Sequence, residues 1–170
     1  LLKVFFNEFL QAFVPEVHAQ LAVGPIEFLD KELFRRTGGR TTRRYVDLVA
    51  KVQLRSTPGL ILVLVEHQAQ RRKDMLWRML QYMVWLQEHY QLPVYPILLC
   101  SYSRPRTPEP KHYRVAVLGE QVIDFRFSVI QLNRLRWQRF CQRPNPAPTA
   151  LMVRMRVKPE DRVRLKLQIL

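Results

Sequence analysis

The clearest pattern in the chain is a run of aliphatic residues that ends in polar side chains. Residues 61–65 are all Ile, Leu or Val, and Glu66, His67 and Gln68 follow directly. A continuous aliphatic run predicts a strand buried on both faces, here over about 60–68. Side chains two residues apart share a face of a strand, so we expect Glu66 and Gln68 to point one way and His67 the other.

A second apolar run, just upstream, also contains an acid. The pattern predicts a strand over about 44–54 with Asp47 inside it, joined to the 60–68 strand by a hairpin loop at residues 56–59. A buried carboxylate costs free energy unless it is paired or bound to a cation. Two neighbouring strands that each carry a carboxylate, Asp47 and Glu66, would form a minimal site of hard oxygen ligands for a divalent metal.

The N-terminal third is less regular. Phe5, Phe9 and Phe13 follow helical spacing and predict a helix over 1–14, with Glu8 on the flank of its apolar stripe. A strand over 26–34 and a basic turn over 35–40 are expected to follow.

The residues after the 60–68 strand predict a helix over about 72–90 and a buried strand over 94–100. A strand, a helix and a strand in this order predict a right-handed crossover between parallel strands. Within the helix, Arg78 and Tyr82 are four residues apart and share a face. The apolar stripe consists of Leu76, Met79, Leu80, Met83 and Leu86.

The remaining chain predicts a hairpin over 113–127, a partly helical segment over 129–140, and two terminal helices over 147–156 and 160–170. We therefore expect one α/β domain over 1–143 and a helical segment over 144–170. The first residue is not Met and the last residues continue a helical pattern, so we expect the helical segment to be truncated.

Charge adds the next constraint. The chain has 28 Lys and Arg against 14 Asp and Glu, a net charge of +14. Such an excess favours a polyanionic partner, although a basic surface that serves only solubility is the simpler alternative. No apolar run is long enough to cross a membrane. Cys100 and Cys141 fit no metal or redox spacing, which favours reduced thiols in a cytoplasmic protein.

The order of these elements, helix, strand, strand with Asp, strand with Glu-x-Gln, helix, strand, resembles the PD-(D/E)XK nuclease core. The local sequence is most similar to one branch, the Rpn recombination-promoting nucleases, which are also described as putative transposases. The matching segments lie in order along nearly the whole chain, at residues 27–34, 44–49, 65–70, 78–83, 92–96, 129–133 and 145–146.

This resemblance implies a restriction-endonuclease-like α/β fold with an α-β-β-β-α-β mixed sheet flanked by helices, extended by a β-hairpin and a C-terminal helical appendage. It implies that Asp47 and Glu66 bind Mg²⁺, with Mn²⁺ or Ca²⁺ as substitutes, and that Glu8 is a third, helix-borne acid. Gln68 stands where many relatives have a catalytic Lys, and Val46 stands where the motif has Pro.

The expected function is therefore metal-dependent endonucleolytic cleavage of DNA, linked to recombination or mobile elements. Arg44 and Lys73 would attract the phosphates, and the face with Arg78 and Tyr82 would line the DNA groove. A symmetric dimer would make a double-strand cut. Two alternatives remain: a catalytically inactive nucleic-acid-binding module on a nuclease-like fold, and an interaction domain.

Overall fold

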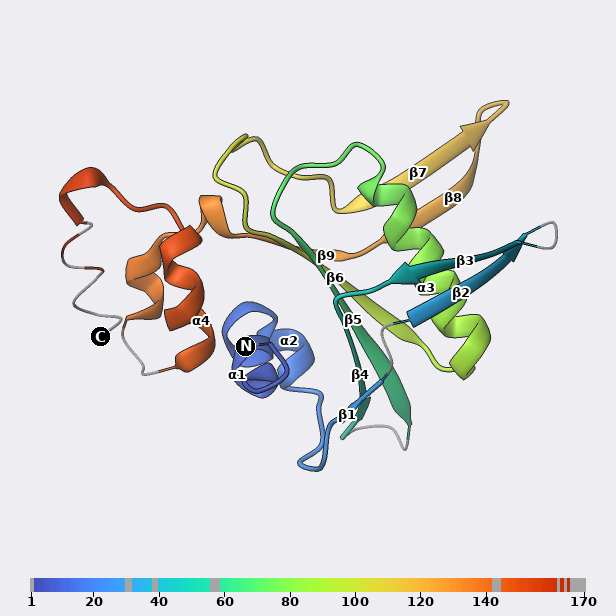
Figure 1. Ribbon diagram of the computed structural model, residues 1–170, viewed down its shortest axis with the longest axis horizontal. Helices are drawn as coiled ribbons and strands as arrows, with labels where there is room; N and C mark the ends of the chain where they lie inside the picture. The colour runs from blue at the N-terminus through green and yellow to red at the C-terminus, as the bar shows by residue number, and fades with distance from the viewer. Residues whose placement is uncertain are drawn as a thin grey trace.

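The structure is a computed structural model in which a five-stranded mixed sheet forms the centre (Figure 1). It describes residues 2–29, 32–37, 40–55, 59–141, 145–161, 163 and 165, with only the backbone at 32–37, 40–45 and 159. The strand order is β1-β4-β5-β6-β9. The strands are β1 (Glu27–Phe28), β4 (Leu48–Gln53), β5 (Leu60–Gln68), β6 (Val94–Cys100) and β9 (Ser128–Gln131).

Helices cover the two faces of this sheet (Figure 1). Helices α1 (Phe6–Phe13) and α2 (Pro15–His18) pack on one face, where the core includes Val63 and Val65 of β5. Helix α3 (Met75–Tyr90) packs on the other face, against Leu62 and Leu64. The aliphatic run of β5 is thus buried on both faces, as its sequence predicts.

Strand directions place several strand ends at one edge of the sheet. Strand β4 is antiparallel to β5, whereas β6 is parallel to β5 and β9 is parallel to β6. The carboxyl ends of β5, β6 and β9 therefore meet the beginning of β4 at the same edge, here called the carboxyl edge. Ligands in open α/β sheets bind outside such an edge.

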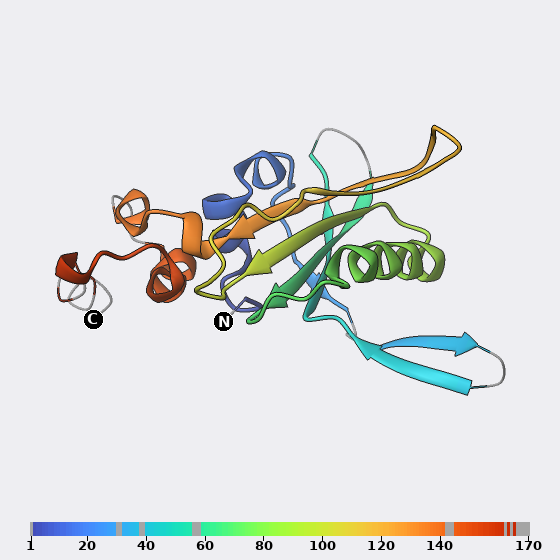
Figure 2. The same ribbon diagram turned by 90° about the horizontal axis from the view of Figure 1, so that it is seen from above.

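Two hairpins extend from the body beside α3 (Figure 2). One pairs β2 (Glu32–Thr37) with β3 (Arg40–Tyr45), and the other pairs β7 (His112–Val117) with β8 (Glu120–Arg126). The β7–β8 turn contains Leu118 and Gly119, both with positive φ angles of 51° and 85°. Glycine adopts this conformation without steric cost, which explains its place in the turn.

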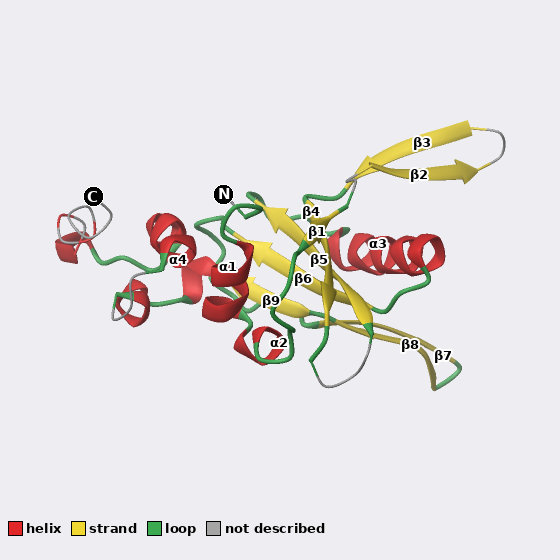
Figure 3. Ribbon diagram, turned by 90° about the horizontal axis from the view of Figure 1, so that it is seen from below, coloured by secondary structure: helices red, strands yellow, loops and turns green. Residues whose placement is uncertain are grey.

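The C-terminal segments lie beyond the carboxyl edge (Figure 3). They comprise short 3-10 turns η1 (Leu132–Arg134), η2 (Trp137–Phe140), η3 (Met152–Arg154) and η4 (Pro159–Asp161), and helix α4 (Pro146–Leu151). Trp137, Met152 and Met155 are buried in the same apolar core as α1. These segments are therefore anchored to the body by their apolar side chains.

Several predicted elements are confirmed, and four are corrected. Strands β5 and β6, their parallel crossover and the β7–β8 hairpin agree with the sequence patterns. The expected strand over 26–34 is divided between β1 and β2. Of the basic turn expected over 35–40, residues 35–37 belong to β2 and Arg40 begins β3, while residues 38 and 39 lie outside the described residues. The expected strand over 44–54 is interrupted before β4, and the segment over 129–140 begins with a strand.

The mixed α/β class is confirmed by the five-stranded sheet and its helices. None of the helices in the described ranges combines the length and the apolar character that a membrane span requires.

Candidate active site at the carboxyl edge

Asp47 and Glu66 lie next to each other at the carboxyl edge. The pairing of β4 with β5 ends with Leu48 opposite Val65, and Asp47 and Glu66 are the next residues along. Leu64 packs against α3, and alternation along β5 places Glu66 on this same face. Asp47 lies in the bend before β4, near enough for its charge to act on Glu66.

Glu66 is a buried carboxylate with only partial compensation. It is 4% exposed, and Oε1 lies 3.3 Å from Nη2 of Arg78. Its other oxygen, Oε2, is buried and has no hydrogen-bond partner among the described residues. Burial, followed by the nearby charge of Asp47, raises the pKa of Glu66 from 4.5 to about 7. The charge of Arg78, the backbone N–H of Asp47 and the charge of Arg72 act in the opposite direction.

Arg78 is held in place by Tyr82, one helical turn later. Nε and Nη2 of Arg78 donate to the Tyr82 hydroxyl at 3.1 and 2.5 Å, and the guanidinium lies 5.4 Å from the centre of the Tyr82 ring. The Tyr82 side chain is fully buried. Tyr82 therefore orients Arg78 from inside the core. Contrary to the expectation from its helical position, its side chain has no exposed surface that could line a DNA groove.

Asp47 supplies the solvent-facing part of the pair. It lies in the bend just before β4 rather than inside a strand, and it is exposed. Its Oδ2 accepts a hydrogen bond from the backbone N–H of His67 at 2.7 Å. This bond fixes the carboxylate beside the end of β5 and leaves the site open to solvent.

Gln68 lies at the last position of β5, on the face that it shares with Glu66. It is buried, and its carbonyl accepts a 2.8 Å hydrogen bond from the N–H of Ser101 after β6. His67 points to the opposite face, where its Nε2 lies 2.7 Å from the Ser101 hydroxyl. The expected alternation of Glu66, His67 and Gln68 is therefore confirmed.

The contacts among the described residues do not join the other predicted site residues, Glu8, Lys73 and Arg44, to Asp47 and Glu66. Glu8 is half-buried on α1, which packs against the sheet face opposite to α3, so the structure does not bring it to Asp47 and Glu66. Lys73 is exposed in the turn between β5 and α3. Arg44 lies on β3, opposite Leu33, and its side chain is outside the described part. Across the described ranges, no three His, Cys, Asp or Glu side chains are grouped to hold a metal ion.

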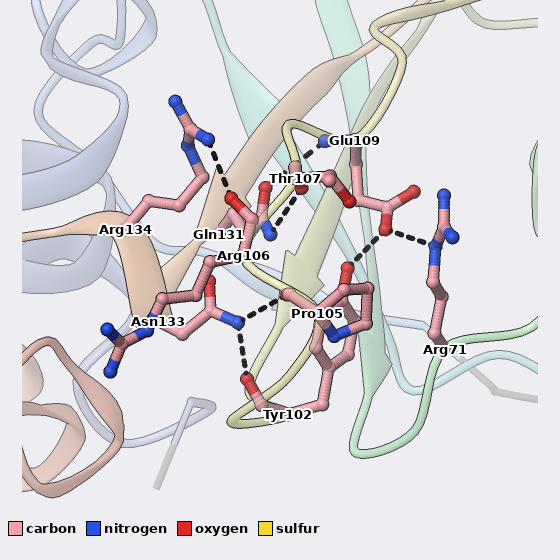
Figure 4. Close-up of polar contacts among 9 residues, drawn as sticks. All are labelled: Arg71, Tyr102, Pro105, Arg106, Thr107, Glu109, Gln131, Asn133 and Arg134. Carbon is pink, nitrogen blue, oxygen red and sulfur yellow. Dashed lines mark hydrogen bonds and ion pairs between the residues drawn. The ribbon is translucent and has the colours of Figure 1, made fainter.

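A polar network that the sequence did not reveal adjoins the same edge (Figure 4). Asn133 Nδ2 donates to the carbonyls of Tyr102 and Pro105, both at 2.9 Å, and Gln131 Nε2 donates to the carbonyl of Thr107 at 3.0 Å. These bonds hold the loop of residues 101–110. Both amides come at the end of a short apolar run, and they lie in the segment 129–133 that carries part of the family resemblance, but neither signal predicts these contacts.

Glu109 connects that loop to the segment after β5. Its Oε1 accepts from Nε of Arg71 at 2.7 Å and from the Tyr102 hydroxyl at 2.5 Å. Its backbone N–H donates to Oε1 of Gln131 at 3.1 Å. The segment after β5 that contains Arg71 is thus tied to the loop by the half-buried carboxylate of Glu109.

A family model described as "Putative transposase, YhgA-like" matches residues 7–98, which is more than half of the chain. The matched region includes Asp47, Glu66, Gln68 and all of α3. Comparison with curated proteins and with solved structures gave no match.

Proposed function

Because the chain belongs to the family of YhgA-like putative transposases, we propose that it is a metal-dependent DNA endonuclease linked to mobile elements or recombination. The proposal includes a PD-(D/E)XK-type core in which Asp47 and Glu66 are the metal ligands. The observation that carries it is the buried, unpartnered Oε2 of Glu66 beside the exposed carboxylate of Asp47.

The donor set fits a hard divalent cation. Two carboxylates lie next to each other, and their mutual repulsion contributes to the raised pKa of Glu66. A cation between them would offset this repulsion and give Oε2 a partner. Mg²⁺ keeps several of its waters and needs only one or two carboxylates, so a third acid such as Glu8 is not required.

Each residue of the site has a role in this reading. When bound, Mg²⁺ lowers the pKa of a coordinated water and offsets the charge that develops on the phosphate. Asp47 and Glu66 would hold the ion, and Arg78 keeps Glu66 oriented by its ion pair. The neutral amide of Gln68 can orient a water molecule, but it cannot supply the positive charge of a Lys. The exposed Lys73 can attract the phosphate.

Cleavage of supercoiled plasmid tests the proposal. We expect nicking in Mg²⁺, its loss in EDTA, and a decrease of at least about 100-fold in Asp47→Asn and Glu66→Gln proteins. Glu88→Gln, an exposed acid near the other end of α3, serves as the matched control and should keep full activity. Undiminished cleavage by the Asp47 and Glu66 variants would remove both residues from the mechanism.

The second candidate is a nucleic-acid-binding module without catalysis. The observation that favours it is the pairing of Glu66 with Arg78, which would be a structural ion pair, together with Gln68 in place of Lys. Binding of DNA that weakens steeply with salt, without cleavage in any divalent metal, would support this candidate over the nuclease.

A further inference from the structure

The C-terminal segments gather most of the excess positive charge of the chain. Residues 134–170 contain ten Lys and Arg but only two acids, Glu160 and Asp161. This stretch therefore contributes +8 to a total of +14. Its described residues lie beyond the carboxyl edge of the sheet and are not among the residues that the candidate active site uses (Figure 3).

Four of these cations line one concavity, here called the basic concavity. It has a volume of about 570 Å³ and is lined by Arg136, Gln138, Arg139, Arg156 and Lys158. All five residues are exposed. None of the described residues that line it is acidic.

The fold brings the arginines together through the main chain. Arg136 and Arg156 form an isolated parallel β-bridge, in which the N–H of Arg156 donates to the carbonyl of Leu135 at 2.9 Å. The N–H of Arg139 donates to the carbonyl of Arg136 at 3.2 Å. The neighbouring residues Trp137 and Met155 are buried at 2% and 6% exposure. The cations are therefore mounted on anchored backbone rather than on a free tail.

Little within the protein compensates these charges. Among the described residues, the side chains of Arg136, Arg139 and Arg156 have no ion pair or hydrogen bond. Lys158 pairs with Glu160 at 3.4 Å, but both side chains are about two-thirds exposed, and such surface pairs contribute little. Asp161 accepts from Gln138 at 3.2 Å. A concavity with clustered like charges is a site that an anion would stabilise.

We propose that the basic concavity binds the sugar-phosphate backbone of nucleic acid beside the candidate active site. This inference deepens the proposed function, since it assigns a substrate-holding surface to the same carboxyl edge. Guanidinium groups bind phosphate oxygens through paired N–H donors, so three arginines can contact successive phosphates. The surface would hold DNA without reading its sequence.

The test is DNA binding without cleavage, measured by fluorescence anisotropy of a short labelled duplex in EDTA over a range of salt. In Arg136→Gln/Arg156→Gln protein we expect about tenfold or weaker affinity and a decrease of about 2 in the slope of log K against log salt. The Arg136→Lys/Arg156→Lys protein keeps both positive charges, so the slope of its log K against log salt should stay close to that of the wild type. Lys3→Gln/Lys111→Gln protein, which loses the same charge at exposed positions elsewhere, is the matched control.

Circular dichroism and the thermal midpoint establish that each variant is folded. An unchanged salt slope in the Arg136→Gln/Arg156→Gln protein, or an equal loss in the lysine control, would overturn the inference. Equal, variant-sensitive binding to vesicles of anionic lipid would overturn it in favour of a membrane surface. Asp47→Asn protein, which should lose cleavage but bind normally, separates failure of this inference from failure of the nuclease proposal.

Discussion

Nη2 of Arg78 lies 3.3 Å from Oε1 of Glu66, and this ion pair joins helix α3 to the end of β5. It covers one oxygen of the carboxylate and leaves Oε2 buried without a partner among the described residues. The pair is therefore only a partial compensation, which is why the pKa of Glu66 stays well above its ordinary value.

Glu66 makes the stability of the metal-free protein depend on pH. Below pH 4.5 the carboxyl group is protonated in both the folded and the unfolded chain. As the pH rises from 4.5 to about 7, the unfolded chain ionises first, so folding loses up to roughly 3 kcal/mol, and above that range the loss is constant. Urea unfolding in EDTA across this range should show the decrease.

The matched measurement is the same series on Glu66→Gln protein. The free energy of unfolding of the wild type minus that of the variant should fall between pH 4.5 and about 7. A difference that is flat over this window would show that Glu66 ionises at its ordinary pKa, and the site would then lack its unusual electrostatics.

Mg²⁺ should stabilise the folded protein through the two carboxylates. A ligand that binds only the folded state adds about 2.7 kcal/mol at 100 times its Kd, so at pH 8 the midpoint of thermal unfolding should rise with Mg²⁺ concentration. The rise should be smaller at pH 5, where Glu66 is protonated. Asp47→Asn and Glu66→Gln proteins should show no such rise, whereas Glu88→Gln should respond as the wild type does. A full response in either site variant would place the ion elsewhere.

The Tyr82 hydroxyl should influence the site through Arg78. Tyr82→Phe keeps the buried ring but removes the acceptor of two hydrogen bonds from Arg78, which should cost about 1–3 kcal/mol of stability. A less fixed guanidinium neutralises Glu66 less well, so the pKa of Glu66 in the folded protein should rise. The fall in the free energy of unfolding that depends on Glu66 should then extend to a higher pH. Tyr113→Phe, whose ring contacts Trp77, is the control for loss of a hydroxyl. An unchanged midpoint in Tyr82→Phe protein would mean that Tyr82 does not position Arg78.

The sequence predicted best where one strong pattern dominates. Strand β5 is a continuous aliphatic run, and its length and alternation follow from burial on both faces. The interruption at Asp47 was not predictable, because residues on both sides of it favour strands. Strand β9 was missed because its four residues are too few to establish a period.

The candidate site was also predicted only in part. Spacing along a helix correctly placed Arg78 and Tyr82 on one face, but it could not show that Tyr82 would be the most buried member of that pair. Apolar residues occur around most of α3, so the sequence pattern does not define which side meets the sheet. The Asn133 contacts and the contact between Glu109 and Gln131 join residues more than twenty positions apart, and no local pattern encodes them.

Asn133 should be the main support of the 101–110 loop. Its amide donates to two carbonyls, those of Tyr102 and Pro105, and the side chain is 3% exposed. Asn133→Ala would leave both carbonyls without this donor, which should cost about 1–3 kcal/mol in urea unfolding. The loop should also open locally, so trypsin should cut after Arg106 faster than in the wild type. Asn7→Ala, at an exposed position of α1, is the control and should change neither measurement. If Asn133→Ala lost stability without faster cutting at Arg106, the residue would support the core rather than the loop.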